Sequence, residues 1–131
     1  MENGLMLISN WKDLINQKDL VGLMQLYLEH AEYFDPLYGH LNRVGIERMW
    51  NHIFKHRAGF KIEIDLLKDE GEGYFSFLLV SHWQKNQQTS IRQDITCHFQ
   101  MESNQILGMS MAFKMHDYCR QMFGWHGSLF G

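Results

Sequence analysis

The chain has 131 residues, close to the commonest size of one domain, with 45% hydrophobic and 21% charged residues. These proportions are typical of a globular protein and exclude a disordered or fibrous chain. A net charge of −3 with 12 basic residues provides no basic surface, so we expect neither nucleic acid nor a membrane as a partner.

The two cysteines, Cys97 and Cys119, could form only one bridge, and nothing else in the sequence is typical of a secreted protein. The apolar residues 5–8 are too short for a signal segment, and no apolar run is long enough to cross a membrane. We therefore expect free thiols and a cytoplasmic location. No cofactor is expected either, because the C-terminal glycines lack the lysine and the strand-to-helix context of a phosphate loop.

Three helices are predicted in the first half of the chain. Apolar positions of residues 7–15 recur with the helical period and predict the first helix. Asp19 is the expected N-cap of a second helix, whose apolar positions run over residues 20–27. A third helix is predicted after Gly45, over residues 46–54, and it ends near His56.

Strands are predicted in two places. Residues 32–39 predict a short strand that ends in an Asp-Pro turn at Asp35 and Pro36, because proline fixes φ and aspartate bonds to turn amides. From residue 60 onward, β-branched and aromatic runs alternate with turn clusters at 68–73, 85–88 and 102–105. This pattern predicts four successive antiparallel strands.

The third of these four strands has two different faces. One face carries Ile91, Ile95, Cys97, Phe99 and Met101, and the other carries Arg92, Asp94, Thr96, His98 and Gln100. We expect the apolar face to point toward a core or cavity. The polar face is a mixed but ordered row, which predicts a homodimer joined through it.

Helices followed by a meandering sheet, with no repeat or linker, predict a single α+β domain over residues 1–131. We expect a cone, in which a curved, mainly antiparallel sheet wraps around the three N-terminal helices. The 14% of aromatic residues and the nine methionines suit the lining of an adaptable apolar cavity, and a methionine-rich core is the alternative.

The segment LMQLYLEHAEYFDPLYGHLNRVGIERMW resembles the signature region of SnoaL-like and ketosteroid isomerase-like proteins of the nuclear transport factor 2-like superfamily. The C-terminal FKMHDYCRQMFGWHGSLFG is similar to the tail of a bacterial subgroup. The resemblance implies a cystatin-like α+β barrel that encloses one small, largely apolar ligand. It does not imply a reaction, because the same cone hosts isomerases, dehydratases, epoxide hydrolases, cyclases and non-catalytic binding modules.

Asp35 is the candidate catalytic residue. The resemblance places it where ketosteroid isomerases carry the carboxylate that moves a proton beside a carbonyl, and the match includes Pro36 and Gly39. In an apolar pocket such a carboxylate loses hydration and becomes a usable base near neutral pH. The alternative is that Asp35 only caps the Asp-Pro turn.

Steroid isomerisation also needs hydrogen-bond donors for the enolate oxygen, and here the sequence departs from the family. The family's donor tyrosine falls on Trp11, whose indole has one N–H of different reach and for which core packing is the alternative. The family's second acid falls on Ile95. A shift by one residue would give Asp94, but Asp94 lies on the polar face with Arg92 and Thr96, so a cavity acid is expected to be missing.

The residues expected to contact the ligand are Trp11, Tyr38, Trp50, Ile95 and Phe99. For Tyr38, packing on the Asp-Pro turn is the alternative to a contact at the cavity mouth. No metal site is expected. The pair His52 and His56 has the helical spacing of two ligands, but no glutamate follows His52 and basic residues share that face.

The leading hypothesis is a small enzyme or enzyme-like protein, isomerase-, cyclase- or hydratase-like. Asp35 would abstract a proton or activate water on a hydrophobic carbonyl or epoxide compound. The alternatives are a non-catalytic dimeric module that binds an apolar ligand and a purely structural dimerisation domain. Gly124 is expected to end the last helix, and Trp125, Leu129 and Phe130 to dock as a lid over the cone or as a clasp between subunits.

Overall fold

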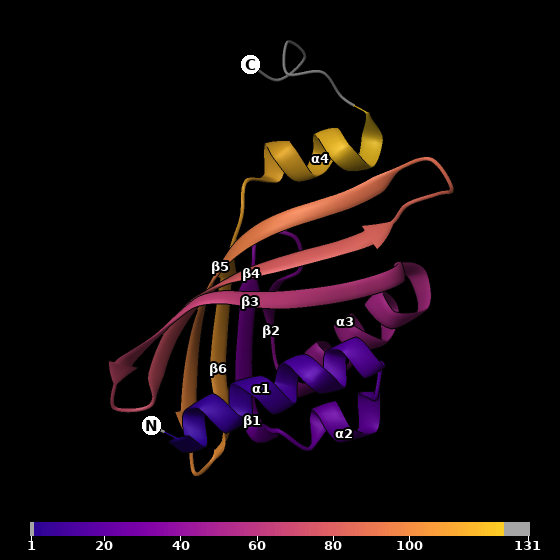
Figure 1. Ribbon diagram of the computed structural model, residues 1–131. Helices are drawn as coiled ribbons and strands as arrows, with labels where there is room; N and C mark the ends of the chain where they lie inside the picture. Colours follow the sequence, from indigo (N-terminus) through magenta and orange to yellow (C-terminus); the bar gives the residue numbers. More distant parts are fainter. Residues whose placement is uncertain (1, 125–131) are drawn as a thin grey trace.

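The computed structural model describes residues 2–124, in which helices and strands follow one another in the order α1–α2–β1–β2–α3–β3–β4–β5–β6–α4 (Figure 1). The helices are α1 (Glu2–Gln17), α2 (Leu20–Met24), α3 (Arg43–His56) and α4 (Met115–Phe123). The strands are β1 (Tyr27–Asp35), β2 (Gly39–Leu41), β3 (Ala58–Gly71), β4 (Tyr74–Gln84), β5 (Ser90–Glu102) and β6 (Gln105–Ala112).

The second helix is shorter than its apolar period predicts. The Asp19 cap is confirmed, because its carboxylate accepts the backbone N–H of Gly22 at 2.9 Å. The helix nevertheless ends at Met24, and Tyr27 opens β1. The carbonyl of Leu26 accepts the N–H of Ile106 at 2.8 Å, so pairing with a distant strand overrides the local helical pattern.

The third helix begins earlier than predicted. Asn42 caps it by accepting the backbone N–H of Gly45 at 2.9 Å, and the helix starts at Arg43. The expected start after Gly45 was wrong because the Asn42 side chain caps the helix by bonding the backbone N–H of Gly45 itself, so the glycine lies inside the first turn.

The strands form one six-stranded curved sheet in the order β2-β1-β6-β5-β4-β3. The four antiparallel strands predicted from residue 60 onward are confirmed as β3 to β6. The strand predicted to end at the Asp-Pro turn is confirmed as β1, which ends at Asp35 but begins earlier, at Tyr27; β2, which follows the turn and forms a hairpin with β1, was not predicted. Strand β1 then pairs in parallel with β6, so the sheet is mixed and stays open between its edges β2 and β3.

Helix α1 packs against β3 and α3 against β1, so the helices cover one face of the curved sheet, as expected for a cone (Figure 1).

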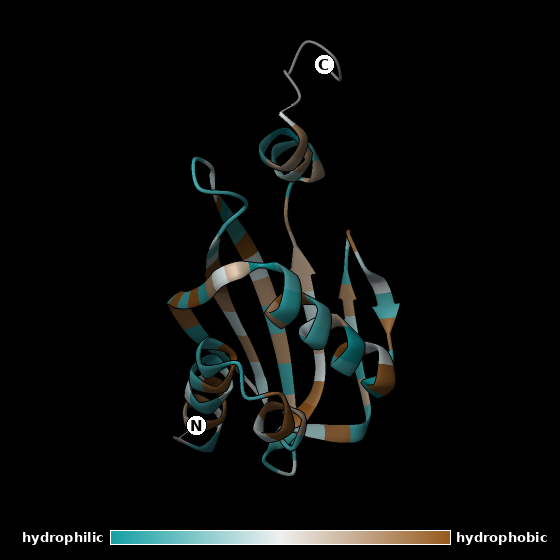
Figure 2. Cartoon of the chain, turned by 90° about the vertical axis from the view of Figure 1, so that its right-hand side faces the viewer, coloured by the Kyte–Doolittle hydropathy of each residue, from teal (hydrophilic) through white to brown (hydrophobic). Residues whose placement is uncertain are grey.

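Side chains alternate between the two faces along the central strands, and Figure 2 shows the resulting change between hydrophilic and hydrophobic residues. On β5 the buried positions include Ile91, Ile95 and Phe99, as predicted. Two polar residues, Ser81 on β4 and Gln93 on β5, occupy the same buried face and are direct partners across the ladder. Cys97, on that face, and the half-buried Cys119 are free thiols.

Helix α4 lies beside β5 beyond the end of β6 (Figure 1). Strand β6 stops at Ala112, opposite Thr96, and Gln121 of α4 then bonds both backbone groups of Arg92: Arg92 N–H to Oε1 at 2.9 Å, and Nε2 to the Arg92 carbonyl at 2.8 Å. The predicted C-cap is confirmed, because Gly124 has a φ of 68° and its N–H bonds to the carbonyl of Arg120.

The predicted docking of Trp125, Leu129 and Phe130 lies outside the described residues. Within the described range 2–124, no helix is both long and apolar enough to span a membrane.

Candidate functional site

Asp35 ends β1 with its side chain only 4% exposed and held by three donors. Its Oδ1 accepts the backbone N–H groups of Leu37 at 2.7 Å and Tyr38 at 2.6 Å. Its Oδ2 accepts the hydroxyl of Tyr33 at 2.5 Å. One oxygen of Asp35 therefore caps the turn, while the other bonds to a buried phenol.

The local sequence explains this arrangement. Asp35 pairs with Gly39 across the β1–β2 hairpin, and residues 36–38 form the loop between them. Pro36 has no N–H, so the amides free to bind the carboxylate are those of Leu37 and Tyr38. Gly39 adopts a φ of 71°, a conformation that is readily accessible to glycine.

Tyr33 was not identified from the sequence. Burial, together with the adjacent charge of Asp35 and the hydrogen bond to it, raises the pKa of Tyr33 well above its ordinary value. The phenol therefore stays protonated and donates to Asp35 at neutral pH. Its hydroxyl also lies 3.4 Å from Sδ of Met111. The sequence did contain a signal for Tyr33: it precedes Asp35 by two positions, and residues two apart on a strand lie on the same face.

Asp35 and Tyr33 line a narrow pocket of about 40 Å³. This volume holds about three water molecules at most. Of the residues predicted to contact a ligand, the pocket includes Tyr38, Trp50 and Ile95, whereas Trp11 and Phe99 lie in the core outside its lining. Its apolar wall consists chiefly of Met49, Trp50, Ile53, Phe60, Leu79 and Ile95.

The indole N–H of Trp11 makes its hydrogen bond inside the core. Its Nε1 donates to the hydroxyl of Tyr27 at 3.1 Å, and Nε1 of Trp50 donates to the same hydroxyl at 3.2 Å. Burial raises the pKa of Tyr27 to about 12, although the two indole hydrogen bonds act in the opposite direction. Both indole N–H groups are therefore engaged by Tyr27 and do not serve as donors to a ligand in this structure.

Three further polar side chains line the narrow pocket, and sequence reasoning missed all of them. Ser81 and Gln93 come from neighbouring strands, and Arg57 directly follows α3. The guanidinium of Arg57 lies 4.3 Å from the ring centroid of Trp83, a cation–π contact that fixes its position. Burial raises the pKa of the half-buried Tyr38, and the charge of Arg57 partly offsets this.

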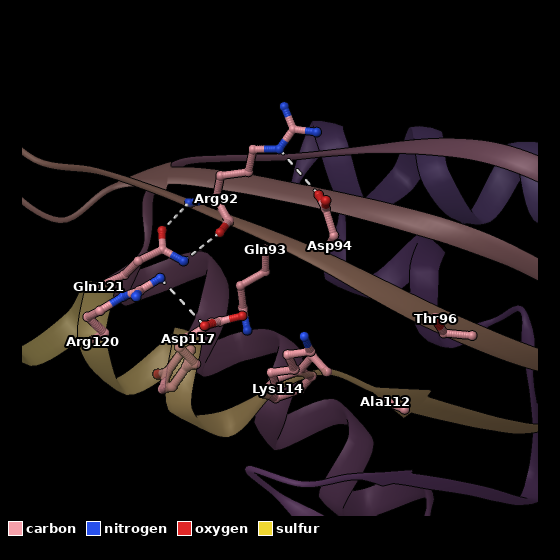
Figure 3. A pocket seen from close by; sticks show the side chains of 11 residues that line it. Arg92, Gln93, Asp94, Thr96, Ala112, Lys114, Asp117, Arg120 and Gln121 are labelled. Carbon is pink, nitrogen blue, oxygen red and sulfur yellow. Dashed lines mark hydrogen bonds and ion pairs between the residues drawn. The ribbon is translucent and has the colours of Figure 1, made fainter. Parts of the chain in front are cut away.

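A larger, open cavity of about 650 Å³ lies between α4 and β5 (Figure 3). Its lining is more polar and includes two ion pairs, Arg92 with Asp94 at 3.2 Å and Arg120 with Asp117 at 3.5 Å. Asp94 is exposed there and is not part of the narrow pocket. Gln93 and Phe113 line both spaces, so these two side chains form the partition between them.

The two histidines of α3 have no further metal-binding side chain grouped with them among the described residues. The rings of His52 and His56 lie 4.5 Å apart. Over the part of the chain that the structure describes, no group of three or more histidine, cysteine, aspartate or glutamate side chains is placed to hold a metal ion.

The chain matches no protein-family model and, by sequence, no curated protein. Its fold does match solved structures, and it is the nuclear transport factor 2-like fold. One such structure, a protein of unknown function with this fold from Burkholderia pseudomallei, is 14% identical, with a TM-score of 0.80 over 94% of this chain and 99% of that one.

Two further structures give the same result. A hypothetical protein with a ketosteroid isomerase-like fold from Catenulispora acidiphila, in complex with trimethylamine, is 12% identical, with a TM-score of 0.79 over 93% of this chain and 95% of that one. An LEH-like epoxide hydrolase from M. tuberculosis is 9% identical, with a TM-score of 0.78 over 99% of this chain and 96% of that one. At these identities the similarity shows a shared fold.

Proposed function

We propose that this protein is a small-molecule enzyme in which Asp35 is the general base, acting on a hydrophobic carbonyl or epoxide compound. The observation that carries the proposal is the buried Asp35 carboxylate, fixed by two turn amides and by Tyr33 in the wall of a largely apolar pocket. A positioned carboxylate shielded from water is what general-base catalysis requires. The ketosteroid isomerase-like and epoxide hydrolase folds among similar structures support the same class of chemistry.

The chemistry uses the free lone pair of Oδ2. With a carbonyl compound, Asp35 takes a proton from the carbon next to the C=O, the C–H electron pair forms a C=C bond, and the carbonyl π pair moves to oxygen. Asp35 then returns the proton to carbon. With an epoxide, Asp35 takes a proton from water as the water oxygen bonds to a ring carbon, and the ring C–O bond breaks with its electron pair moving to the ring oxygen. The resulting alkoxide takes up a proton from solvent to give the diol, and Asp35 returns its own proton to solvent. Tyr33 holds the carboxylate in place throughout.

The substrate needs more room than the narrow pocket offers. Binding sites for small molecules usually measure about 300–1,000 Å³, whereas the pocket at Asp35 has about 40 Å³. The cavity beside α4 supplies about 650 Å³ directly behind the partition of Gln93 and Phe113. The reacting end of the substrate therefore lies at Asp35, its body lies under α4, and Phe113 turns aside to connect the two spaces.

The test is turnover of a panel of small ketones and epoxides, including 2-tetralone and styrene oxide. Exchange of acidic C–H for deuterium is followed by NMR, and diol formation by chromatography. Asp35→Asn keeps the Oδ1 acceptor for the turn amides, so the hairpin should persist while the base is lost. We expect a loss of about 100-fold or more in rate, with the exposed Asp13→Asn variant unchanged. Turnover that survives in Asp35→Asn refutes the proposal.

The rival function is a non-catalytic dimeric module that binds an apolar ligand. It is favoured by the engagement of both Asp35 oxygens and by the small pocket. Saturable binding of an apolar fluorescent probe, with no turnover anywhere in the panel, would decide for it.

The homodimer is a proposal common to both functions. We infer that two subunits meet through the outer sheet face, where Arg92, Thr96 and His98 are exposed. Arg92 and Thr96 also line the cavity beside α4, so the partner subunit would cover part of that cavity. Light scattering at micromolar concentration should give twice the 15.6 kDa mass, and a monomer mass would refute it. The free thiols support a reducing compartment, and we propose the cytoplasm.

A further inference from the structure

Ser81 carries a buried hydroxyl with no hydrogen-bond partner among the described residues. The residue lies on β4 between Leu79 and Trp83 on the buried face, is 2% exposed and lines the pocket of Asp35. Its Oγ has no hydrogen-bond partner within residues 2–124. Nearly all buried polar side-chain atoms have a partner, so an exception beside a pocket indicates that something else supplies one.

Two other side chains that can donate hydrogen bonds line the same pocket as this hydroxyl. Gln93 is the direct partner of Ser81 in the β4–β5 ladder and is 7% exposed on the same buried face. Arg57 enters from the end of α3 and is held over Trp83, two residues beyond Ser81. A hydroxyl, a primary amide and a guanidinium from three elements thus line the same small pocket as Asp35.

We propose that Ser81, Gln93 and Arg57 bind one oxygen of the substrate and stabilise it when it becomes negatively charged. This proposal rests on the function proposed above for Asp35 and specifies the substrate: a ketone or aldehyde with an acidic C–H beside the carbonyl. Asp35 removes that proton, the electron pair reaches the oxygen through the new C=C bond, and the three donors hold the resulting enolate. Return of the proton to carbon restores the carbonyl, so no other reactant is required.

The acidity of the donors selects the carbonyl compound over the epoxide. A serine hydroxyl, an amide and an always-charged guanidinium donate hydrogen bonds but are very weak acids. An enolate needs stabilisation and no proton on oxygen, whereas the alkoxide of an opened epoxide must take up a proton. The donor set therefore fits the first reaction.

The first arm of the test measures proton exchange of 2-tetralone by Ser81→Ala. Loss of one donor to a developing oxyanion costs on the order of 100-fold in rate, so we expect that loss in kcat with little change in KM. The unfolding midpoint should not fall, because no hydrogen bond of Ser81 is removed. Ser110→Ala, an exposed position on β6, is the matched control, and Ser81→Thr, which restores a hydroxyl, should recover part of the rate. Exchange by Ser81→Ala at the wild-type rate overturns the proposal.

The second arm separates this proposal from the role of Asp35. In the Asp35→Asn background, carbonyl-labelled 2-tetralone is bound and its C=O stretch is measured by infrared difference spectroscopy. We expect a shift to lower frequency than in water, and a smaller shift when Ser81→Ala, Gln93→Leu or Arg57→Met is added. An unshifted band refutes the oxygen subsite whatever Asp35 does. Hydrolysis of styrene oxide that depends on Asp35, without ketone exchange, also overturns the subsite while upholding the base.

Discussion

Replacing Tyr27 by phenylalanine tests the hydrogen-bonded centre of the core. The change keeps the ring and so leaves no large cavity, but it removes the only acceptor that the structure shows for the indole N–H groups of Trp11 and Trp50. Both indoles are buried, so water does not replace the lost acceptor. A buried donor left without a partner costs about 1–3 kcal/mol. With two donors, we therefore expect the free energy of unfolding to fall by about 2–6 kcal/mol.

Urea denaturation, followed by circular dichroism, measures this loss. The matched control is Tyr74→Phe, because Tyr74 is 48% exposed and its replacement should change stability by less than about 0.5 kcal/mol. If Tyr27→Phe cost no more than Tyr74→Phe, the two indole hydrogen bonds would contribute nothing to the folded state, and the reasoning about unsatisfied donors would be refuted.

Three further predictions concern the same packing. Burial raises the pKa of Tyr27 to about 12 from an ordinary value near 10, so the contribution of the protonated Tyr27 to folding stability is complete below pH 10 and is lost as pH rises toward 12. Between these values, the stability of the wild type relative to Tyr27→Phe should fall by about 1.4 kcal/mol per pH unit. A difference that stays constant with pH in urea titrations would contradict this. Trp50→Ala should cost about 3–5 kcal/mol through the cavity it leaves, and an unchanged urea midpoint would show that Trp50 is not a core residue. Gln121→Ala removes both hydrogen bonds to Arg92, so amide exchange over Met115–Phe123 should accelerate, and unchanged protection would show that these bonds do not hold α4.

Elements with a local signal were predictable from the sequence. The alternation that defines β5, the Asp19 cap of α2 and the Gly124 cap that ends α4 each depend on a few neighbouring residues. The end of the second helix was not predictable, because it depends on the hydrogen bond between Leu26 and Ile106, two residues far apart in the sequence. The parallel contact of β1 with β6 has no local pattern at all.

The candidate site divides in the same way. Asp35 was identifiable because its proline neighbour marks the turn that anchors its carboxylate. Ser81 and Gln93 occupy the same alternate positions along their strands as the buried apolar residues on either side. The two-residue period of a strand would therefore have placed them on the buried face. Arg57 could not be predicted in this way, since it follows helix α3 and its position depends on a contact with the ring of Trp83 on β4. The engagement of Trp11 by Tyr27 likewise depends on tertiary packing.

The parallel pairing of β1 with β6 has a consequence for the order in which the protein forms. The β1–β2 hairpin, which carries Asp35, joins the rest of the sheet only through β6, the last of the described strands in chain order. Tyr33, for example, meets Met111, 78 positions later in the chain. Contacts between such distant segments form late and slow folding, because the intervening loop must first be closed. During synthesis, β3, β4 and β5 are therefore complete while the β1–β2 hairpin still lacks its neighbour, and the pocket that Asp35 lines is closed only when Met111 of β6 joins its wall.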